Sequence, residues 1–121
     1  MKHFKQLRIW QLGIDISLSC FKLTSHFPTD ERFSLGNQIR RSAYSIPSNF
    51  AEGSSRNSQK DQSRFIDISI GSSFELETQL ILSFNLKYIN EVEYNNMRLL
   101  IVEEQKMIYG FTNSLSNNIN N

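Results

Sequence analysis

The chain has 121 residues, of which 39% are hydrophobic and 21% are charged, and this is the size and composition of one globular domain. Its formal net charge of +1 excludes the strong basic excess typical of a protein that coats DNA. Cys20 is the single cysteine, so the sequence has no intramolecular disulfide and no cysteine metal site. We expect Cys20 to be a small buried hydrophobe.

The sequence shows no signal peptide and no membrane-spanning segment. No stretch of about 18 apolar residues occurs that could span a membrane, and no positively charged start is followed by an apolar run. The sequence therefore predicts a cytoplasmic protein with no membrane partner.

The first predicted helix, from about Phe4 to Thr24, has apolar stripes on opposite sides when residues are placed at 3.6 per turn. One stripe comprises Leu7, Trp10, Ile14, Leu18 and Phe21. The other comprises Ile9, Leu12, Ile16, Cys20 and Leu23. A helix with two opposed stripes must be covered from two directions, and three other helices leave room for a cover from another subunit. We predict that the second stripe is an oligomer interface.

A break around Pro28 separates this helix from the next, whose apolar seam consists of Leu35, Ile39, Ile46 and Phe50. Seams of this spacing are typical of bundle helices. Pro47 lies inside the seam, where its ring displaces one backbone hydrogen bond. The sequence predicts a kink at residues 43–47, with a helix that stops at Ser45 and restarts as the alternative.

The last two predicted helices begin at recognisable caps. Gly53 is expected to end the second helix, and Ser58 with Asp61 resembles a capping box for the third, which extends to about Tyr88. Asn90 caps the fourth. Short connections then predict an all-α, antiparallel, up-down-up-down four-helix bundle over residues 1–115, followed by a disordered Asn-rich tail at residues 116–121.

Motifs that carry chemistry are lacking. His3 and His26 are the only histidines, and neither belongs to the Glu-x-x-His pairs of a di-iron bundle. We therefore predict no catalytic residue, no metal and no cofactor. Glu77 and Glu104 fall on apolar faces, where a carboxylate could act as an acid or bind a metal. We favour the alternative that each pairs with an arginine, Arg40 or Arg41, within the chain or across a subunit boundary, since an unpaired buried charge is costly.

Five cations are candidates for binding nucleic acid. Arg56, Lys60 and Arg64 cluster around the break before the third helix, and Arg40 and Arg41 add to them. Arginines beside a helix N-terminus suit phosphate, although most such clusters are solvated surface. A ring would repeat the patch and make it multivalent.

Two blocks of sequence resemble a known family. The run from Leu35 to Gly53 is similar to the pattern L-x-x-Q-I-R-R-A-x-x-S-I-P-x-N-I-A-E-G, and the run from Ile70 to Glu77 to the pattern G-S-x-x-E-L-E. Both patterns are those of the bacterial four-helix-bundle family of the 23S rRNA intervening-sequence protein, the S23 family. The chain departs from the first pattern at Ser42, Tyr44 and Phe50. The positions that match are Arg40, Arg41, Asn49, Glu52, Gly53, Arg56, Gly71, Ser72, Glu75 and Glu77.

This resemblance implies a bundle that assembles as a homopentameric ring. Members are encoded within 23S rRNA genes, and the related accessory protein of diversity-generating retroelements partners a reverse transcriptase and binds nucleic acid. We predict that the polar motif residues form one network that fixes helix register and the subunit boundary, with Arg41 paired to Glu75. Its members would be Arg40, Arg41, Asn49, Glu52, Glu75 and Glu77.

Our leading interpretation is a non-catalytic, homo-oligomeric scaffold associated with RNA or DNA. The alternative is an assembly or adaptor ring that presents a surface to another protein without nucleic acid. An enzyme with Glu75 or Glu77 as its acid or base is a third reading, for which the sequence offers neither cleft nor substrate.

Overall fold

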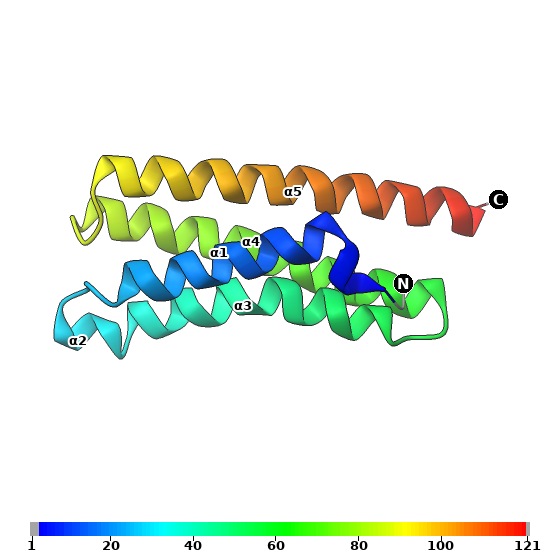
Figure 1. The fold of residues 1–121 in the computed structure, drawn as a ribbon, viewed down its shortest axis with the longest axis horizontal. Coiled ribbons are helices and arrows are strands. Elements are labelled where there is room, and N and C mark those ends of the chain that lie inside the picture. The colour runs from blue at the N-terminus through cyan, green and yellow to red at the C-terminus, as the bar shows by residue number, and fades with distance from the viewer. Residues whose placement is uncertain (1–2, 121) are drawn as a thin grey trace.

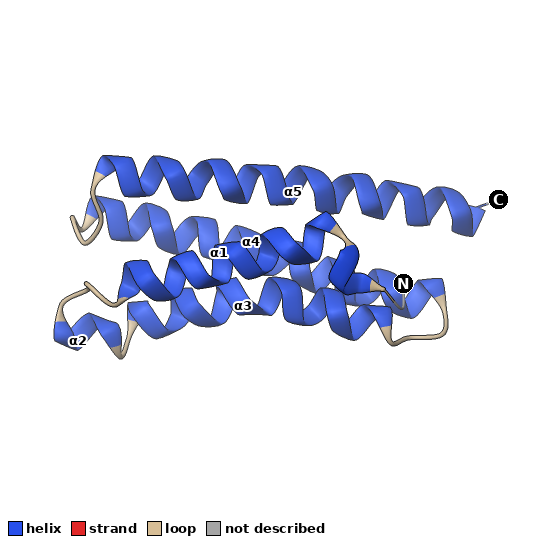
Figure 2. Cartoon of the chain, in the orientation of Figure 1, coloured by secondary structure: helices blue, strands red, loops and turns tan. Residues whose placement is uncertain are grey.

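A computed structural model describes the backbone of residues 3–120 and the side chains of residues 3–115. After a short 3-10 helix, η1 (Phe4–Gln6), the chain is built from α-helices. These are α1 (Arg8–Thr24), α2 (Thr29–Arg32), α3 (Leu35–Ser54), α4 (Gln59–Asn85) and α5 (Glu91–Asn120). The residues described include no strand (Figure 2), so the predicted all-α class is confirmed.

The four long helices form an antiparallel bundle (Figure 1). Helix α1 packs against α3 and α5, and α4 packs against the same two helices. Because the connections are short, each long helix reverses the direction of the one before it. The α3–α4 loop therefore lies at the same end of the bundle as the start of α1, and α2 lies at the opposite end (Figure 1).

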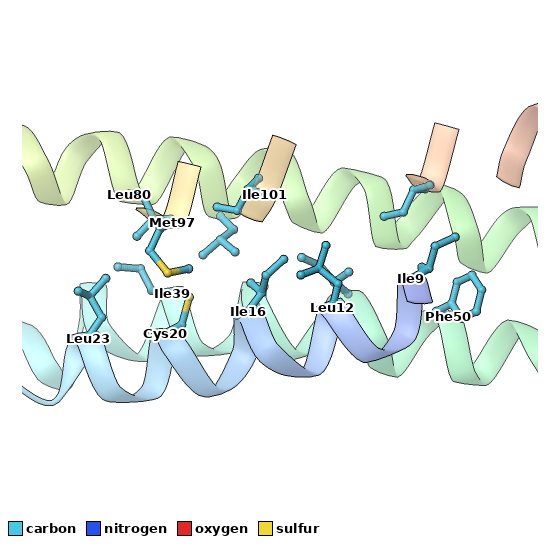
Figure 3. Close-up of a cluster of buried hydrophobic side chains, with 14 of the residues drawn as sticks. Ile9, Leu12, Ile16, Cys20, Leu23, Ile39, Phe50, Leu80, Met97 and Ile101 are labelled. Atoms are coloured by element: carbon cyan, nitrogen blue, oxygen red, sulfur yellow. The ribbon is translucent and has the colours of Figure 1, made fainter. Parts of the chain in front are cut away.

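The core is formed by one apolar stripe from each helix. Phe50 of α3, Leu80 of α4, and Met97 and Ile101 of α5 point into the bundle and are buried (Figure 3). From α1 the inward stripe comprises Ile9, Leu12, Ile16, Cys20 and Leu23. The prediction that this stripe is an oligomer interface is therefore wrong, because its own chain already covers it.

Small residues explain why this side of α1 faces inward. Gly13, Ser17 and Thr24 are buried beside the inward stripe. Ser17 Oγ donates to the Gly13 carbonyl oxygen (2.8 Å) and Thr24 Oγ1 to the Cys20 carbonyl oxygen (2.7 Å), so their hydroxyls are satisfied within the helix. A β-carbon on Gly13 would lie only 3.1 Å from Pro47 Cβ. Small side chains thus let α1 approach α3 closely.

Several helix ends agree with the sequence and others do not. Ser58 Oγ accepts from the Asp61 amide (3.1 Å). Asn90 and Glu93 cap one another reciprocally at the start of α5. Helix α3 runs unbroken through Pro47, so a stop at Ser45 is wrong.

The chain departs from the predicted boundaries in three further places. Helix α2 was not predicted. Gly53 lies inside α3 instead of ending it; a β-carbon there would meet Phe65 Cβ of α4 at 3.1 Å, so its role is close helix packing. The backbone of α5 is helical to Asn120, beyond the predicted boundary at residue 115. The side chains of the predicted tail, residues 116–121, lie outside the described part of the chain.

Candidate nucleic-acid interface

The α3–α4 end of the bundle carries three of the predicted cations, all exposed: Arg56, Lys60 and Arg64. The Phe65 ring organises two of them. The Arg56 guanidinium carbon lies 4.7 Å from the ring centroid and that of Arg64 lies 5.8 Å from it, distances at which a cation is attracted to an aromatic face. One ring therefore gathers two guanidinium groups at this end.

Nearby carboxylates offset part of this charge. Arg56 Nη2 donates to Glu52 Oε1 at 2.6 Å, and Asp61 occupies the first turn of α4, where a carboxylate is favoured by the helix dipole. Gln62 Nε2 donates to the Arg56 carbonyl oxygen (3.0 Å) and braces the loop. The α3–α4 end of the bundle is therefore only weakly basic. Such a surface suits a phosphate backbone when it supplies one of several contacts to the same nucleic acid.

Arg40 and Arg41 do not join this cluster. They lie about 20 Å from the last turn of α3, at a rise of 1.5 Å per residue. Arg40 Nε donates to Thr24 Oγ1 (2.7 Å), and its guanidinium lies 4.8 Å from the Phe21 ring centroid. Arg41 is exposed. The candidate cations therefore lie at two separate places on the bundle, and Arg40 connects α3 to α1.

The motif residues do not form one network either. Asn49 Nδ2 donates to the Ser45 carbonyl oxygen (2.8 Å) and Glu52 pairs with Arg56. Glu75 Oε1 accepts from Ser42 Oγ (2.9 Å), in place of the predicted pairing with Arg41. Within residues 3–115 these are separate contacts, so the predicted continuous network does not form inside one chain. Its role at a subunit boundary stays a prediction.

Among the described residues, neither Glu77 nor Glu104 pairs with an arginine. Glu77 Oε2 is 3.5 Å from Gln105 Nε2 on α5. Glu104 is fully buried, and neither of its carboxylate oxygens has a hydrogen-bond partner among the described residues. Burial raises the pKa of Glu104 to about 8, with nearby Arg8 opposing the shift and Glu103 reinforcing it. The ion pairs predicted within the chain are therefore wrong, because Arg40 is bonded across to α1 and Arg41 is exposed.

The outward side of α1 is the side left uncovered. Leu18 is 65% exposed and Phe21 is 43% exposed. Trp10 is half-buried and packs edge-on against Phe4 of η1, with ring centroids 5.5 Å apart. Other exposed apolar side chains on α4 and α5 include Phe74, Ile81 and Tyr109, and Phe74 and Tyr109 lie near one another (6.5 Å between ring centroids).

Sequence reasoning missed two residues that shape these surfaces. Phe65 was not among the candidate site residues, although it directly follows Arg64 in the sequence and this adjacency was a usable signal. Arg8 lies within 3.8 Å of Asp15 and of Glu103, and so links α1 to α5. Its partner on α5 is not readable from local spacing.

Two classes of site have no support in the described residues. No group of three or more His, Cys, Asp or Glu side chains gathers there as a metal site. Within the same part of the chain, every helix is too short or too polar to cross a membrane.

Comparison with known proteins points to one family. The family model described as 23S rRNA-intervening sequence protein matches residues 5–110. A solved structure is also similar: a protein of unknown function from the S23 ribosomal protein family of Bacteroides thetaiotaomicron, with a TM-score of 0.81 and 21% identity over 86% of this chain and 97% of that one. At this identity the likeness shows the shared fold. No curated protein matches the chain.

Proposed function

Because this chain belongs to the 23S rRNA-intervening sequence protein family, we propose that it is a non-catalytic, self-assembling scaffold that binds RNA or DNA through the α3–α4 end of its bundle. The observation that carries the proposal is the gathering of Arg56 and Arg64 on the Phe65 ring, with Lys60 exposed beside them. Guanidinium groups in a fixed position suit phosphate oxygens better than mobile ones.

Assembly is needed for this surface to bind with useful strength. One bundle offers three cations, one of which is paired with Glu52. A few phosphate contacts give weak, salt-sensitive binding. When several copies face one nucleic acid, each later contact becomes intramolecular and the total affinity rises steeply. The proposal therefore joins oligomerisation and nucleic-acid binding.

Two separate apolar surfaces are proposed for assembly. Leu18 and Phe21 are exposed on α1, and Phe74 and Ile81 are exposed on α4, and these two helices pack on α3 and α5 and not on each other. Exposed apolar patches favour association, and one patch of each copy would contact the other patch of the next. The homopentameric ring expected from the sequence is part of this proposal, and these residues replace the inward stripe of α1 as its interface.

Light scattering tests the assembly. We expect a mass about five times the 14.1 kDa of the chain, and we expect the double variant Leu18→Glu and Phe21→Glu to reduce it while the variant stays helical by circular dichroism. Asp15→Lys and Lys22→Asp, on the polar side of the same helix, serve as the control. A wild-type monomer at all concentrations would contradict the proposal.

Salt-dependent binding to a fluorescent structured RNA and to a single-stranded DNA tests the interface. The charge reversal of Arg56, Lys60 and Arg64 to Glu is expected to weaken binding at least about tenfold at low salt. The control reverses Lys22, Arg32 and Lys87 to Glu at the opposite end, which changes net charge equally, and its affinity should stay within about threefold of wild type. Equal loss in both variants would contradict a localised interface.

A second function is favoured by one specific observation, the near-neutral net charge of +1. An adaptor ring that presents its surface to a protein, for example a reverse transcriptase, needs no basic excess. Assembly in light scattering, together with no binding to either nucleic acid at low salt, would replace the leading proposal with this one.

A further inference from the structure

Glu104 occupies an unusual place at the centre of the bundle. A β-carbon on Gly13 of α1 would lie 3.1 Å from Glu104 Oε2, 3.1 Å from Pro47 Cβ and 3.2 Å from Pro47 Cδ. The missing side chain of Gly13 thus leaves a space that is bordered by the carboxyl group of Glu104 on α5 and by the proline ring on α3. Helices α3 and α5 are diagonal neighbours, since each packs mainly against α1 and α4.

The backbone of α3 is incomplete at the same place. Pro47 lies inside the helix and has no N–H, so the carbonyl of Ala43, one turn earlier, loses its helical donor and is directed at the proline ring. Ala43 and Pro47 are both buried, and a buried carbonyl without a donor is costly. No side chain of residues 3–115 donates to the Ala43 carbonyl, although the nearby carbonyls of Ser45 and Ile46 each accept a side-chain hydrogen bond.

We propose that Glu104 is a protonated acid that donates its hydrogen to the carbonyl of Ala43, and that this bond is a pH-sensitive latch between α5 and α3. A neutral carboxyl group is the form that an apolar interior accepts. Its O–H group supplies the hydrogen-bond donor that the Ala43 carbonyl lacks. The bond also gives the otherwise unpartnered carboxyl group its partner. This inference does not depend on nucleic-acid binding.

The charged groups around Glu104 leave its proton in place. From α1, Arg8 favours the ionised form, but it is engaged by Asp15 and Glu103 at the surface. From α5 itself, Glu103 favours the protonated form. From α4, Glu77 contacts Gln105, the residue after Glu104. The charged residues of α3 are Arg40, Arg41 and Glu52, and none is bonded to Glu104.

The pH dependence follows from the direction of the shift. Burial raises the pKa of Glu104 from 4.5 to about 8, so the folded state holds the proton more tightly than the unfolded state does. The latch contributes its full stabilisation of the folded state when the pH is below 4.5, the pKa of Glu104 in the unfolded chain. This stabilisation weakens as the pH rises from 4.5 to about 8, and it is lost above about pH 8.

Urea unfolding from pH 5 to pH 9 tests the latch in the full chain. The wild-type midpoint should fall over this range, whereas Glu104→Gln, which keeps a donor and cannot ionise, should lose that fall and unfold at higher urea than wild type at pH 9. Glu103→Gln removes the adjacent exposed carboxylate and should keep the wild-type fall. The same fall in wild type and Glu104→Gln would overturn the proposal.

A second experiment tests the acceptor. At pH 6, Glu104→Leu, which cannot donate, should unfold at lower urea than Glu104→Gln. This difference should disappear in the Pro47→Ala background, because a backbone N–H is restored for the Ala43 carbonyl. An equal difference in both backgrounds would overturn the assignment of Ala43 as acceptor.

If the Glu104 variants do not fold, the wild-type protein still decides. With carbon-13 in the glutamate side chains, one carboxyl signal should remain that of a protonated acid at pH 7 and titrate well above the others. Glutamate signals that are all ionised at pH 7 would overturn the proposal.

Discussion

The two sides of α1 carry equally strong apolar stripes but meet opposite surroundings. Leu12 and Ile16 on the inward side are almost completely buried, whereas Leu18 and Phe21 on the outward side are exposed. Only the beginning of the outward stripe is covered, where Trp10 packs against η1. Apolar content therefore does not decide which side of this helix enters the core.

The small residues between the stripes decide it. Gly13, Ser17 and Thr24 are buried on the inward side, and the missing side chain of Gly13 leaves room for Pro47 of α3 and for Glu104. Close packing gains dispersion contacts with every atom brought within range. The comparison teaches that the buried face of α1 is the inward stripe together with the small residues beside it.

Truncating one residue of each stripe to alanine tests this comparison, and it is the test with the largest expected effect. Ile16→Ala should lower the free energy of unfolding by about 2–5 kcal/mol, because it leaves a cavity in a fully buried layer. Leu18→Ala should change it by less than about 0.5 kcal/mol in dilute protein. Urea denaturation measures both, and similar losses would mean that the outward stripe is also covered within one chain.

A β-carbon at Gly13 should have the next largest effect. Gly13→Ala brings its methyl group against Pro47 and the Glu104 carboxyl group, and overpacking of about 1–3 kcal/mol outweighs the gain of about 1 kcal/mol in helix propensity. We expect a net loss of about 1 kcal/mol. At Gly71, which has no described atom within 4 Å of the added carbon, the same change should stabilise the protein. Thermal unfolding of the two variants should therefore shift in opposite directions.

The smallest effect separates two adjacent arginines that look equivalent in the sequence. Arg40→Ala removes the hydrogen bond to Thr24 and the contact with the Phe21 ring, and should lower the free energy of unfolding by about 1 kcal/mol. Arg41→Ala, at an exposed position, should cost less than about 0.5 kcal/mol. Urea denaturation measures both variants. A larger loss in the free energy of unfolding for Arg41→Ala than for Arg40→Ala would contradict the assignment of Arg40 as the residue that links α3 to α1.

The fold was predictable because its signals are local. The seam of α3 and the caps at Ser58 and Asn90 depend on spacings of three or four residues, and the structure bears them out. Proline was harder to interpret. Its effect at position 47 depends on whether tertiary packing holds the helix on both sides of it, and here α1 and α4 both pack against α3.

The candidate site was predictable only in part. The cluster of Arg56, Lys60 and Arg64 was visible because its members are close in sequence. The partner of Arg40, Thr24, could not be predicted. It lies on α1, and the inward side of α1 had been assigned to an oligomer interface. For Glu104 the expectation of an ion pair was sound chemistry, but a neutral carboxyl group is the other solution to burial, and Gly13 and Pro47 provide the place for it.

Burial of Cys20 also has a practical consequence. Its thiol is fully buried in the inward stripe, and desolvation raises its pKa to about 12, so at neutral pH it is protonated and out of reach of alkylating reagents. Modification then requires the helices around it to separate. The alkylation rate of the unaltered protein therefore reports how often the bundle opens, and a bound nucleic acid or neighbouring subunit that holds the helices together would slow it.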